Sequence, residues 1–369
     1  MKKILFLIHD LEHGGAEKVL VNLVNNMDKS KFDITVMTLF DVGVNKQFLS
    51  SDITYKSCFT KVIRGNSHLM KLLSPSQLHK WLIKEKYDIE VSYLEGPCAR
   101  IISGCPDKDT KLVSWIHIEQ KTKERASIGF RSYEEALECY NKYDQIVCVS
   151  ETVKEDFQSI FPVVVPTDVR YNTNETKRII ELSKEKIGEN FFSDKEIKLV
   201  GVGKLLENKG FDRIERIVNR LIQENYPIHF YILGVGPEKE NLERYALEQR
   251  ISEQVTLLGY QTNPYKYVAK CDLFVCASFA EGFSTAATEA LIVGTPVCTV
   301  EVSGMKEMLG ENNEYGIVTE NDEESLYKSI KSLLDNAEKL KHYREKAKER
   351  GMEFSTEKTV KAVEELLET

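Results

Sequence analysis

The chain alternates short, continuous apolar runs with segments whose apolar residues recur at helical spacing. In the first half, the segment 17–27 places Val19, Leu20, Leu23, Val24 and Met27 along one helix face. The continuous runs predict strands at residues 3–8, 33–40, 88–94, 111–117 and 145–150. Continuous apolar strands separated by helices indicate a parallel sheet that is covered on both faces.

The second half repeats this pattern. Helices are predicted at 211–225 and 323–337, and two more in the last stretch, broken near Gly351. Strands are predicted at residues 197–203, 228–234, 255–259, 272–278 and 295–300. Proline and polar residues interrupt the pattern within 162–178, which places a domain boundary there. The prediction is an α/β protein of two doubly wound, Rossmann-like domains, with ligands bound in the cleft at the strands' carboxyl ends.

Composition and charge narrow the class of protein. The chain has 369 residues, of which 42% are hydrophobic and 29% charged, as in ordinary globular proteins. Residues 1–170 carry as many basic as acidic side chains, so the remainder supplies the whole net charge of −8. This balance argues against a general nucleic-acid binder. The 8 cysteines include no C-x-x-C pair, and we expect reduced, buried thiols that bind no metal.

The opening MKKILFLIHD superficially resembles a secretory signal, but its apolar run of residues 4–8 is too short for one. No stretch approaches the 18 consecutive apolar residues of a membrane-spanning helix. We therefore expect a cytoplasmic protein.

Two glycine-containing loops follow predicted strands. Gly14 and Gly15, in HDLEHGGAEKV, precede a helix whose first N–H groups could bind an anion; the alternative is a tight turn. In LVGVGKLLENKG, Lys204 and Lys209 lie beyond a strand end, where two ammonium groups could bind a diphosphate. Neither a P-loop nor a complete G-x-G-x-x-G motif is present, and two solvated lysines remain the alternative.

The segment 271–297, CDLFVCASFAEGFSTAATEALIVGTPV, is more specific. A strand leads into a loop with Glu281, and a helix then begins at Ser284 or Thr285, either of which can cap it. Glu289 lies about one turn into this helix. Carboxylates bind sugar hydroxyls, and the helix start can bind phosphate. The alternative makes Glu281 a surface residue and Glu289 a stabiliser of the helix dipole.

Two further candidates occur in the first half. His117 ends a predicted strand, where it could accept or hold a proton, although a structural histidine is the alternative. Asp107-Lys108-Asp109 has the D-x-D form of a metal-binding pair, but its composition is that of a surface loop. We predict no metal site.

Taken in order along the chain, these segments resemble glycosyltransferase family 4, a retaining family with the GT-B fold. The resemblance rests on HGGAEK, WIH, GVGKLLENKG, LGVGPEKENLE, LLGYQTNPY and the E-x7-E segment, and it covers nearly the whole chain. It implies an acceptor-binding domain at 1–170, a donor-binding domain at 171–350, and a C-terminal helix at 351–369 that packs back on the first domain.

The resemblance also implies roles for individual residues. Gly14 and Gly15 would offer N–H groups to the donor phosphates, and Lys204 and Lys209 would bind the diphosphate. Family members usually have Arg where this chain has Lys204, so the bidentate contact of a guanidinium is lost. Glu281, with the backbone of Gly282 and Phe283, would bind hydroxyls of the donor sugar. Glu289 would bind the ribose, Tyr260 would lie near the base, and His117 would lie beside the reacting centre.

These roles imply a metal-independent transfer of a hexose from a nucleotide-diphosphate sugar, UDP by the family's habit, with no cofactor. Lys204, Lys209 and the helix start at 284–286 would stabilise the leaving group. The acceptor would be a glycan or a polyprenyl-diphosphate glycan used in capsule, cell-wall or exopolysaccharide synthesis. A sugar-nucleotide epimerase of the same fold and a non-catalytic partner subunit are the alternatives.

The segment 61–86 carries six basic residues, Glu85 as its one acid, and interleaved apolar residues that include Leu72 and Trp81. This composition suits contact with an anionic membrane. An ordinary packed helix pair is the alternative.

Overall fold

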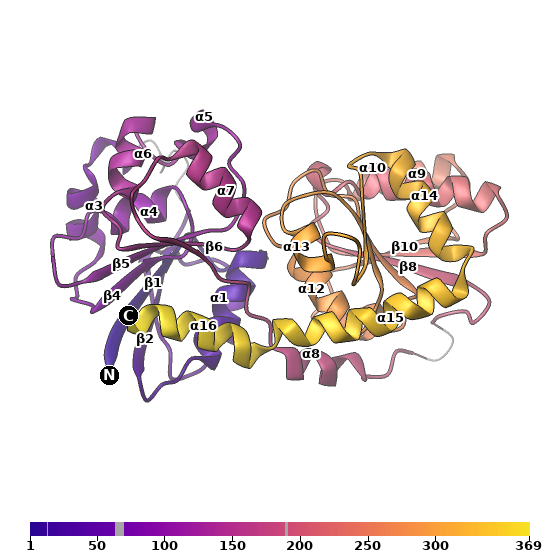
Figure 1. Ribbon diagram of the computed structural model, residues 1–369, viewed down its shortest axis with the longest axis horizontal. Coiled ribbons are helices and arrows are strands. Elements are labelled where there is room, and N and C mark those ends of the chain that lie inside the picture. Colours follow the sequence, from indigo (N-terminus) through magenta and orange to yellow (C-terminus); the bar gives the residue numbers. More distant parts are fainter. Residues whose placement is uncertain (13, 63–69, 189–190) are drawn as a thin grey trace. The chain divides into compact units, whose positions relative to one another are not determined.

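The computed structural model describes residues 1–12, 14–62, 70–188 and 191–369 (Figure 1). These residues form two compact units. Unit 1 comprises Met1–Asn174 together with Thr356–Thr369, and unit 2 comprises Glu175–Ser355. The divisions predicted at 170/171 and 350/351 differ from these bounds by a few residues.

Unit 1 is built on a parallel sheet of seven strands in the order β3-β2-β1-β4-β5-β6-β7. The strands are β1 (Lys2–Ile8), β2 (Phe32–Phe40), β3 (Thr54–Phe59), β4 (Ile89–Ser92), β5 (Lys111–Ile116), β6 (Gln145–Cys148) and β7 (Thr167–Val169). The side chains of Ile4–Ile8 are fully buried, because the central strand β1 is covered on both faces.

Helices cover both faces of this sheet, with α1 and α16 on one side and α3, α4 and α6 on the other (Figure 1). The helices are α1 (Gly15–Asn26), η1 (Val44–Phe48), α3 (Pro75–Leu82), α4 (Pro97–Ile102), α5 (Lys123–Ala126), α6 (Tyr133–Tyr140), α7 (Glu151–Ile160) and α16 (Thr356–Glu368). Helix α16 is fixed to the rest of unit 1 by basic side chains that donate to its carbonyl groups. Lys111 Nζ lies 2.6 Å from the carbonyl of Leu366, and Arg170 Nε lies 2.9 Å from that of Ala362.

Unit 2 contains a parallel sheet of six strands in the order β10-β9-β8-β11-β12-β13. The strands are β8 (Ile197–Val202), β9 (Ile228–Leu233), β10 (Val255–Gly259), β11 (Leu273–Cys276), β12 (Val297–Val300) and β13 (Ile317–Thr319). The helices are α8 (Thr176–Ser183), η2 (Glu207–Lys209), α9 (Phe211–Gln223), α10 (Lys239–Glu248), α11 (Tyr265–Val268), α12 (Thr285–Ile292), α13 (Met305–Leu309), α14 (Glu323–Leu334), α15 (Ala337–Gly351) and η3 (Met352–Phe354).

Each sheet has one point at which the strand order reverses direction. The reversal lies between β1 and β4 in unit 1 and between β8 and β11 in unit 2. Loops that leave the carboxyl ends of such a strand pair diverge to opposite faces, which leaves a crevice where ligands of doubly wound sheets bind. The loops after these four strands are therefore where a functional site is expected.

All the strands predicted from apolar runs are present, whereas β3, β7 and β13 were not predicted. Strand β3 (TYKSCF) mixes polar with apolar residues at the edge of its sheet, and β7 and β13 have only 3 residues each. Such short edge strands bury too little apolar surface to leave a continuous hydrophobic run in the sequence.

Candidate functional site

Two loops meet at the point of reversal in unit 2. The loop after β8 ends at Gly210, which has a positive φ of 64°, and a Cβ there would lie 2.2 Å from the carbonyl oxygen of Ala277. Glycine is therefore required for this approach. The backbone N–H of Phe279 donates to the carbonyl of Asn208 at 2.8 Å and joins the two loops. Residues 204–210 and 277–284, predicted separately from the sequence, thus form one surface.

Lys209 and Glu281 form the centre of this surface. Lys209 Nζ lies 2.7 Å from Glu281 Oε1, and the Ser278 hydroxyl donates to the same oxygen at 2.7 Å. The Glu281 side chain is 12% exposed and that of Lys209 is 26% exposed, so the ion pair is partly screened from water yet accessible. Lys204, on the same loop, is exposed. An ammonium group and a carboxylate so placed can bind an anionic group and a hydroxyl side by side.

The helix α12 begins where the sequence predicted. Ser284 is its N-cap, with its hydroxyl accepting from the N–H of Ala287 at 3.3 Å, and Thr285 is its first residue. Glu289 lies one turn into the helix and is only 7% exposed, with Tyr265 Oη 3.4 Å from its Oε1. Before the helix, Phe283 is buried and its ring contacts that of Phe354 edge-on. The loop carrying Gly282 is thus fixed on a packed side chain.

Tyr260 occupies a different place in unit 2. It follows β10, an edge strand that β9 separates from β8, and its side chain is 45% exposed. The structure therefore brings Lys209, Glu281 and the start of α12 together, and leaves Tyr260 on the flank of the sheet.

The remaining predicted residues belong to unit 1. Gly14 is the N-cap of α1, Gly15 is its first residue, and His13 lies outside the described residues. A Cβ on Gly14 would lie 1.8 Å from Oε2 of Glu17, so this carboxylate folds back over the helix start. The loop leaves β1, one of the two strands at the point of reversal.

His117 follows β5 and has an unusual environment. Its ring packs against that of Tyr93 with 4.9 Å between centroids, while Nε2 is buried and has no hydrogen-bond partner among the described residues. Burial lowers the pKa of His117 to about 4, so the imidazole is neutral near pH 7. A neutral imidazole can accept a hydrogen bond at Nε2 when Nδ1 carries the proton. Of the two expected roles, holding a proton at neutral pH is thus disfavoured, and accepting a hydrogen bond is favoured.

Glu95 is a candidate that the sequence-based reasoning missed. It follows β4 at the point of reversal, and its carboxylate accepts from the backbone N–H of His117 at 3.2 Å and from Gln120 Nε2 at 3.3 Å. Burial raises the pKa of Glu95 above its usual range. The sequence could have indicated this candidate, because YLEGP places Glu95 immediately after the predicted strand 88–94.

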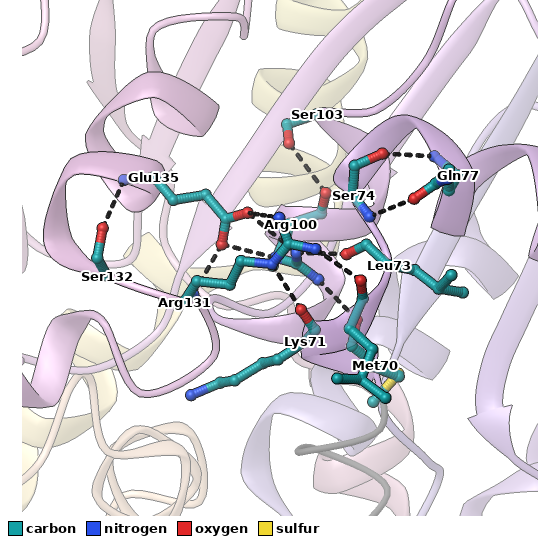
Figure 2. A network of polar contacts seen from close by, with 11 residues as sticks. Met70, Lys71, Leu73, Ser74, Gln77, Arg100, Ser103, Arg131, Ser132 and Glu135 are labelled. Atoms are coloured by element: carbon teal, nitrogen blue, oxygen red, sulfur yellow. Dashed lines mark hydrogen bonds and ion pairs between the residues drawn. The ribbon is translucent and has the colours of Figure 1, made fainter.

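The segment 61–86 is described only in part, because residues 63–69 lie outside the described residues. Two arginines fix the part that follows (Figure 2). The buried Arg100 donates to the carbonyls of Met70 at 3.1 Å and Leu73 at 2.7 Å, and it pairs with Glu135. Arg131 donates to the carbonyls of Lys71 at 2.5 Å and Leu72 at 2.8 Å.

In this network, the carbonyl groups of residues 70–73 accept from the two arginines, while the side chain of Leu72 remains exposed to solvent. Leu72 is 73% exposed, and Trp81 on α3 is 46% exposed. Helix α3 begins with a capping box of Ser74 and Gln77. Residues 70–82 are therefore a well-packed part of the unit 1 surface that leaves two large apolar side chains exposed to water.

Asp107 of the D-x-D string pairs with Lys86 at 2.7 Å and accepts from the N–H of Asp109 at 3.0 Å. The string thus forms a local turn. Within the described ranges, every helix is too short or too polar to cross a lipid bilayer.

Comparisons with known proteins agree with this architecture. The family model described as Glycosyltransferase Family 4 matches residues 13–174, and the model described as Glycosyl transferases group 1 matches residues 183–350. The chain is 28% identical over 368 residues to N-acetylgalactosamine-N,N'-diacetylbacillosaminyl-diphospho-undecaprenol 4-alpha-N-acetylgalactosaminyltransferase of Campylobacter jejuni, with 96% of each chain covered. It is 23% identical to the lipopolysaccharide core biosynthesis glycosyltransferase LpsE of Rhizobium meliloti, with 97% of each covered.

Solved structures give the same fold. Anabaena HepE in complex with UDP and glucose superposes with a TM-score of 0.80 at 18% identity, with 100% of both chains covered. Staphylococcus aureus TarM, in a complex that includes UDP, superposes with a TM-score of 0.77 at 16% identity over 100% of both chains. The fold is therefore GT-B, as the sequence predicted. With both halves matched by the two models, this chain belongs to the GT-B glycosyltransferases of family 4 and group 1.

Proposed function

We propose that the protein transfers a hexose or N-acetylhexosamine from a UDP-sugar to a glycan on a polyprenyl diphosphate, with retention and without a metal. The pairing of Lys209 with Glu281 beside the start of α12 carries this proposal, because it puts a cation, a carboxylate and the first N–H groups of a helix at one point. The Campylobacter relative, whose name gives an N-acetylgalactosamine transfer to a diphospho-undecaprenol glycan, supports the acceptor class. The UDP complexes of HepE and TarM support UDP as the nucleotide of the donor.

In this proposal, unit 2 binds the donor. Lys204 and Lys209 bind the diphosphate, and the N–H groups at the start of α12 add to the positive potential there. When Lys209 turns to the phosphate, Glu281 is released to accept from sugar hydroxyls, together with the backbone of Gly282 and Phe283. Glu289 binds the ribose, and the exposed ring of Tyr260 flanks the base.

Unit 1 contributes the remaining groups. The N–H of Gly15 at the start of α1 binds donor phosphate, and that of Gly14, which donates to the carbonyl of Glu12 at 2.8 Å, joins it when this bond breaks. His117 accepts a hydrogen bond from a sugar hydroxyl at Nε2, which gives this buried nitrogen a partner. Glu95 is a positioning residue, because it holds the backbone of His117.

The chemistry follows from these contacts. The acceptor hydroxyl oxygen forms a bond to the anomeric carbon on the face from which UDP departs. The bond between that carbon and the diphosphate oxygen breaks, and the hydroxyl proton passes to a donor phosphate oxygen. The negative charge that develops on UDP is stabilised by the two lysines and by α12, which replaces the role of a divalent ion.

Incubating the purified protein with a panel of UDP- and GDP-sugars in excess chelator tests the proposal. We expect one UDP-sugar to release UDP slowly alone, and faster with a short polyprenyl-diphosphate glycan. The product should carry an α linkage from an α-linked donor. A new nucleotide sugar would instead identify an epimerase. Absence of both binding and turnover would identify a partner subunit, and dependence on added Mg²⁺ would refute the metal-free mechanism.

We also propose that the surface around Leu72 and Trp81 contacts an anionic membrane, where the acceptor lies. Lys71 and Lys80, next to these apolar groups in the sequence, supply the complementary charge. We expect flotation with vesicles containing anionic lipid to exceed that with zwitterionic vesicles, and Leu72→Asp to abolish the difference. The matched control is Leu247→Asp, because Leu247 is equally exposed (71%) but lies in unit 2. Equal flotation of both variants would contradict the proposal.

A further inference from the structure

Three side chains of the types that can bind metals converge in unit 1, near the amino end of β4. His79 comes from α3, Glu90 from β4, and Cys105 from the turn after α4. Their ligand atoms all lie within 4.8 Å of one another. Within the described ranges, this is the one group of three His, Cys, Asp or Glu side chains gathered so closely.

Glu90 is an unusual residue for its position. It lies in β4 between β1 and β5, with Leu5 and Leu112 as its neighbours in the sheet, and it is 1% exposed. Its Oε2 lies 2.7 Å from Nε2 of His79, which is 5% exposed. A carboxylate in the middle of a buried sheet requires a compensating positive charge, which a proton on His79 or a bound cation could supply.

The turn that carries Cys105 is fixed against α3. A Cβ on Gly104 would lie 2.1 Å from the carbonyl oxygen of Pro75, so only glycine permits this approach. Pro75 lies one helical turn before His79, which brings the half-buried thiol of Cys105 beside the imidazole. The N–H of Cys105 donates to the carbonyl of Ile102 at 3.0 Å and holds the turn in place. The three ligands therefore rest on elements that are already packed together.

Although the sequence led us to expect no metal-binding cysteine, we propose that His79, Glu90 and Cys105 form a Zn²⁺ site, with water as the fourth ligand. Imidazole nitrogen, carboxylate oxygen and thiolate sulfur are the ligands that zinc takes in proteins. A carboxylate and a thiolate neutralise the ion's charge, so the complex can stay buried. In a tetrahedral site, ligand atoms lie about 3.3–3.6 Å apart, so Nε2 of His79 and Oε2 of Glu90 would have to separate by roughly 0.6 Å. The sulfur of Cys105 would approach any ligand atom from which it lies farther than this, within the present limit of 4.8 Å.

The site lies apart from the loops at the carboxyl ends of the strands. Glu90 lies toward the amino end of β4, whereas Glu95 lies beyond its carboxyl end, at the point of reversal. Zinc would link α3, β4 and the turn after α4, and would hold the helix that carries Trp81. The metal-free chemistry proposed for the donor loops of unit 2 is unaffected.

Zinc retention by the untagged protein tests the site. The chelator-treated protein is mixed with Zn²⁺, passed through a desalting column and analysed for metal. We expect about one zinc per chain in the wild type, and binding at least about tenfold weaker in Cys105→Ser, because a ligand is lost. Cys58→Ser is the matched control, since Cys58 is a half-buried thiol of unit 1 outside the group.

A second measurement identifies the sulfur ligand. Co²⁺ in place of Zn²⁺ should give a thiolate-to-metal charge-transfer band that Cys105→Ser removes and Cys58→Ser retains. Zinc should also raise the Tm of the wild type but not that of Cys105→Ser. A wild type that retains no zinc, or a cobalt complex without the thiolate band, would overturn the proposal and leave a protonated His79 paired with Glu90.

Discussion

Glu215 provides a sharp test of how the unit 2 core responds to pH. It lies on α9, is fully buried, and neither carboxylate oxygen has a hydrogen-bond partner among the described residues. Burial raises the pKa of Glu215 to about 8, and the nearby Asp212 adds to the rise. The side chain is therefore mainly a neutral carboxylic acid near pH 7.

The sign of the effect on stability follows from proton binding. The folded protein holds this proton up to about pH 8, whereas the unfolded chain releases it near the ordinary value of 4.5. The folded state therefore loses stability as pH rises between these two values. Each pH unit corresponds to about 1.36 kcal/mol, so the loss between pH 5.5 and 7.5 is about 2–3 kcal/mol.

Urea denaturation of the wild type and Glu215→Gln at a series of pH values measures this loss. The glutamine keeps the shape but does not titrate. The variant should therefore gain stability relative to the wild type with rising pH, and the difference should level off above pH 8. Glu248→Gln, an exposed acid on the neighbouring α10, should run parallel to the wild type. Parallel curves for Glu215→Gln as well would show that the carboxyl group is ionised or solvated, and would refute the reasoning.

Three further predictions concern the candidate site. Lys209→Ala should lower turnover at least about tenfold, because a charge-assisted contact is worth roughly 1.5–3 kcal/mol. Steady-state UDP release measures this, and wild-type turnover would exclude the role. Glu289→Ala should also lower turnover at least about tenfold through the loss of its bonds to the ribose, while Glu289→Gln should recover part of it. His117→Ala should reduce turnover without removing an inflection from the pH profile between 6 and 8, because the pKa of His117 is about 4. The loss of such an inflection would show that the histidine titrates during the reaction.

The sequence predicted the central strands because they are buried on both faces and must be apolar throughout. Residues 4–8 and 228–233 show this directly, since a short, largely apolar run matches neither an amphipathic helix nor a half-exposed strand. The start of α12 was also predictable, because Ser284 caps it and Glu281 lies in the loop before it.

Features that depend on contacts between distant residues could not be predicted. The pairing of Lys209 with Glu281 joins residues 72 positions apart, and it exists because β8 and β11 are neighbours in the sheet. The group of His79, Glu90 and Cys105 has no short spacing pattern, since each ligand lies on a different element. The burial of Glu215 depends on α10, which packs against α9 one turn further along, where Asn219 contacts Tyr245 and Gln249.

The chain passes between the two units twice, near residue 174 and again near residue 355. Unit 2 is consequently one uninterrupted stretch of the chain, whereas unit 1 is assembled from two stretches. During synthesis on the ribosome, unit 2 emerges before α16. The seven-stranded sheet of unit 1 therefore lacks its last covering helix until the whole of unit 2 has been synthesised. A deletion confined to the final helix would thus damage the half of the enzyme that was translated first.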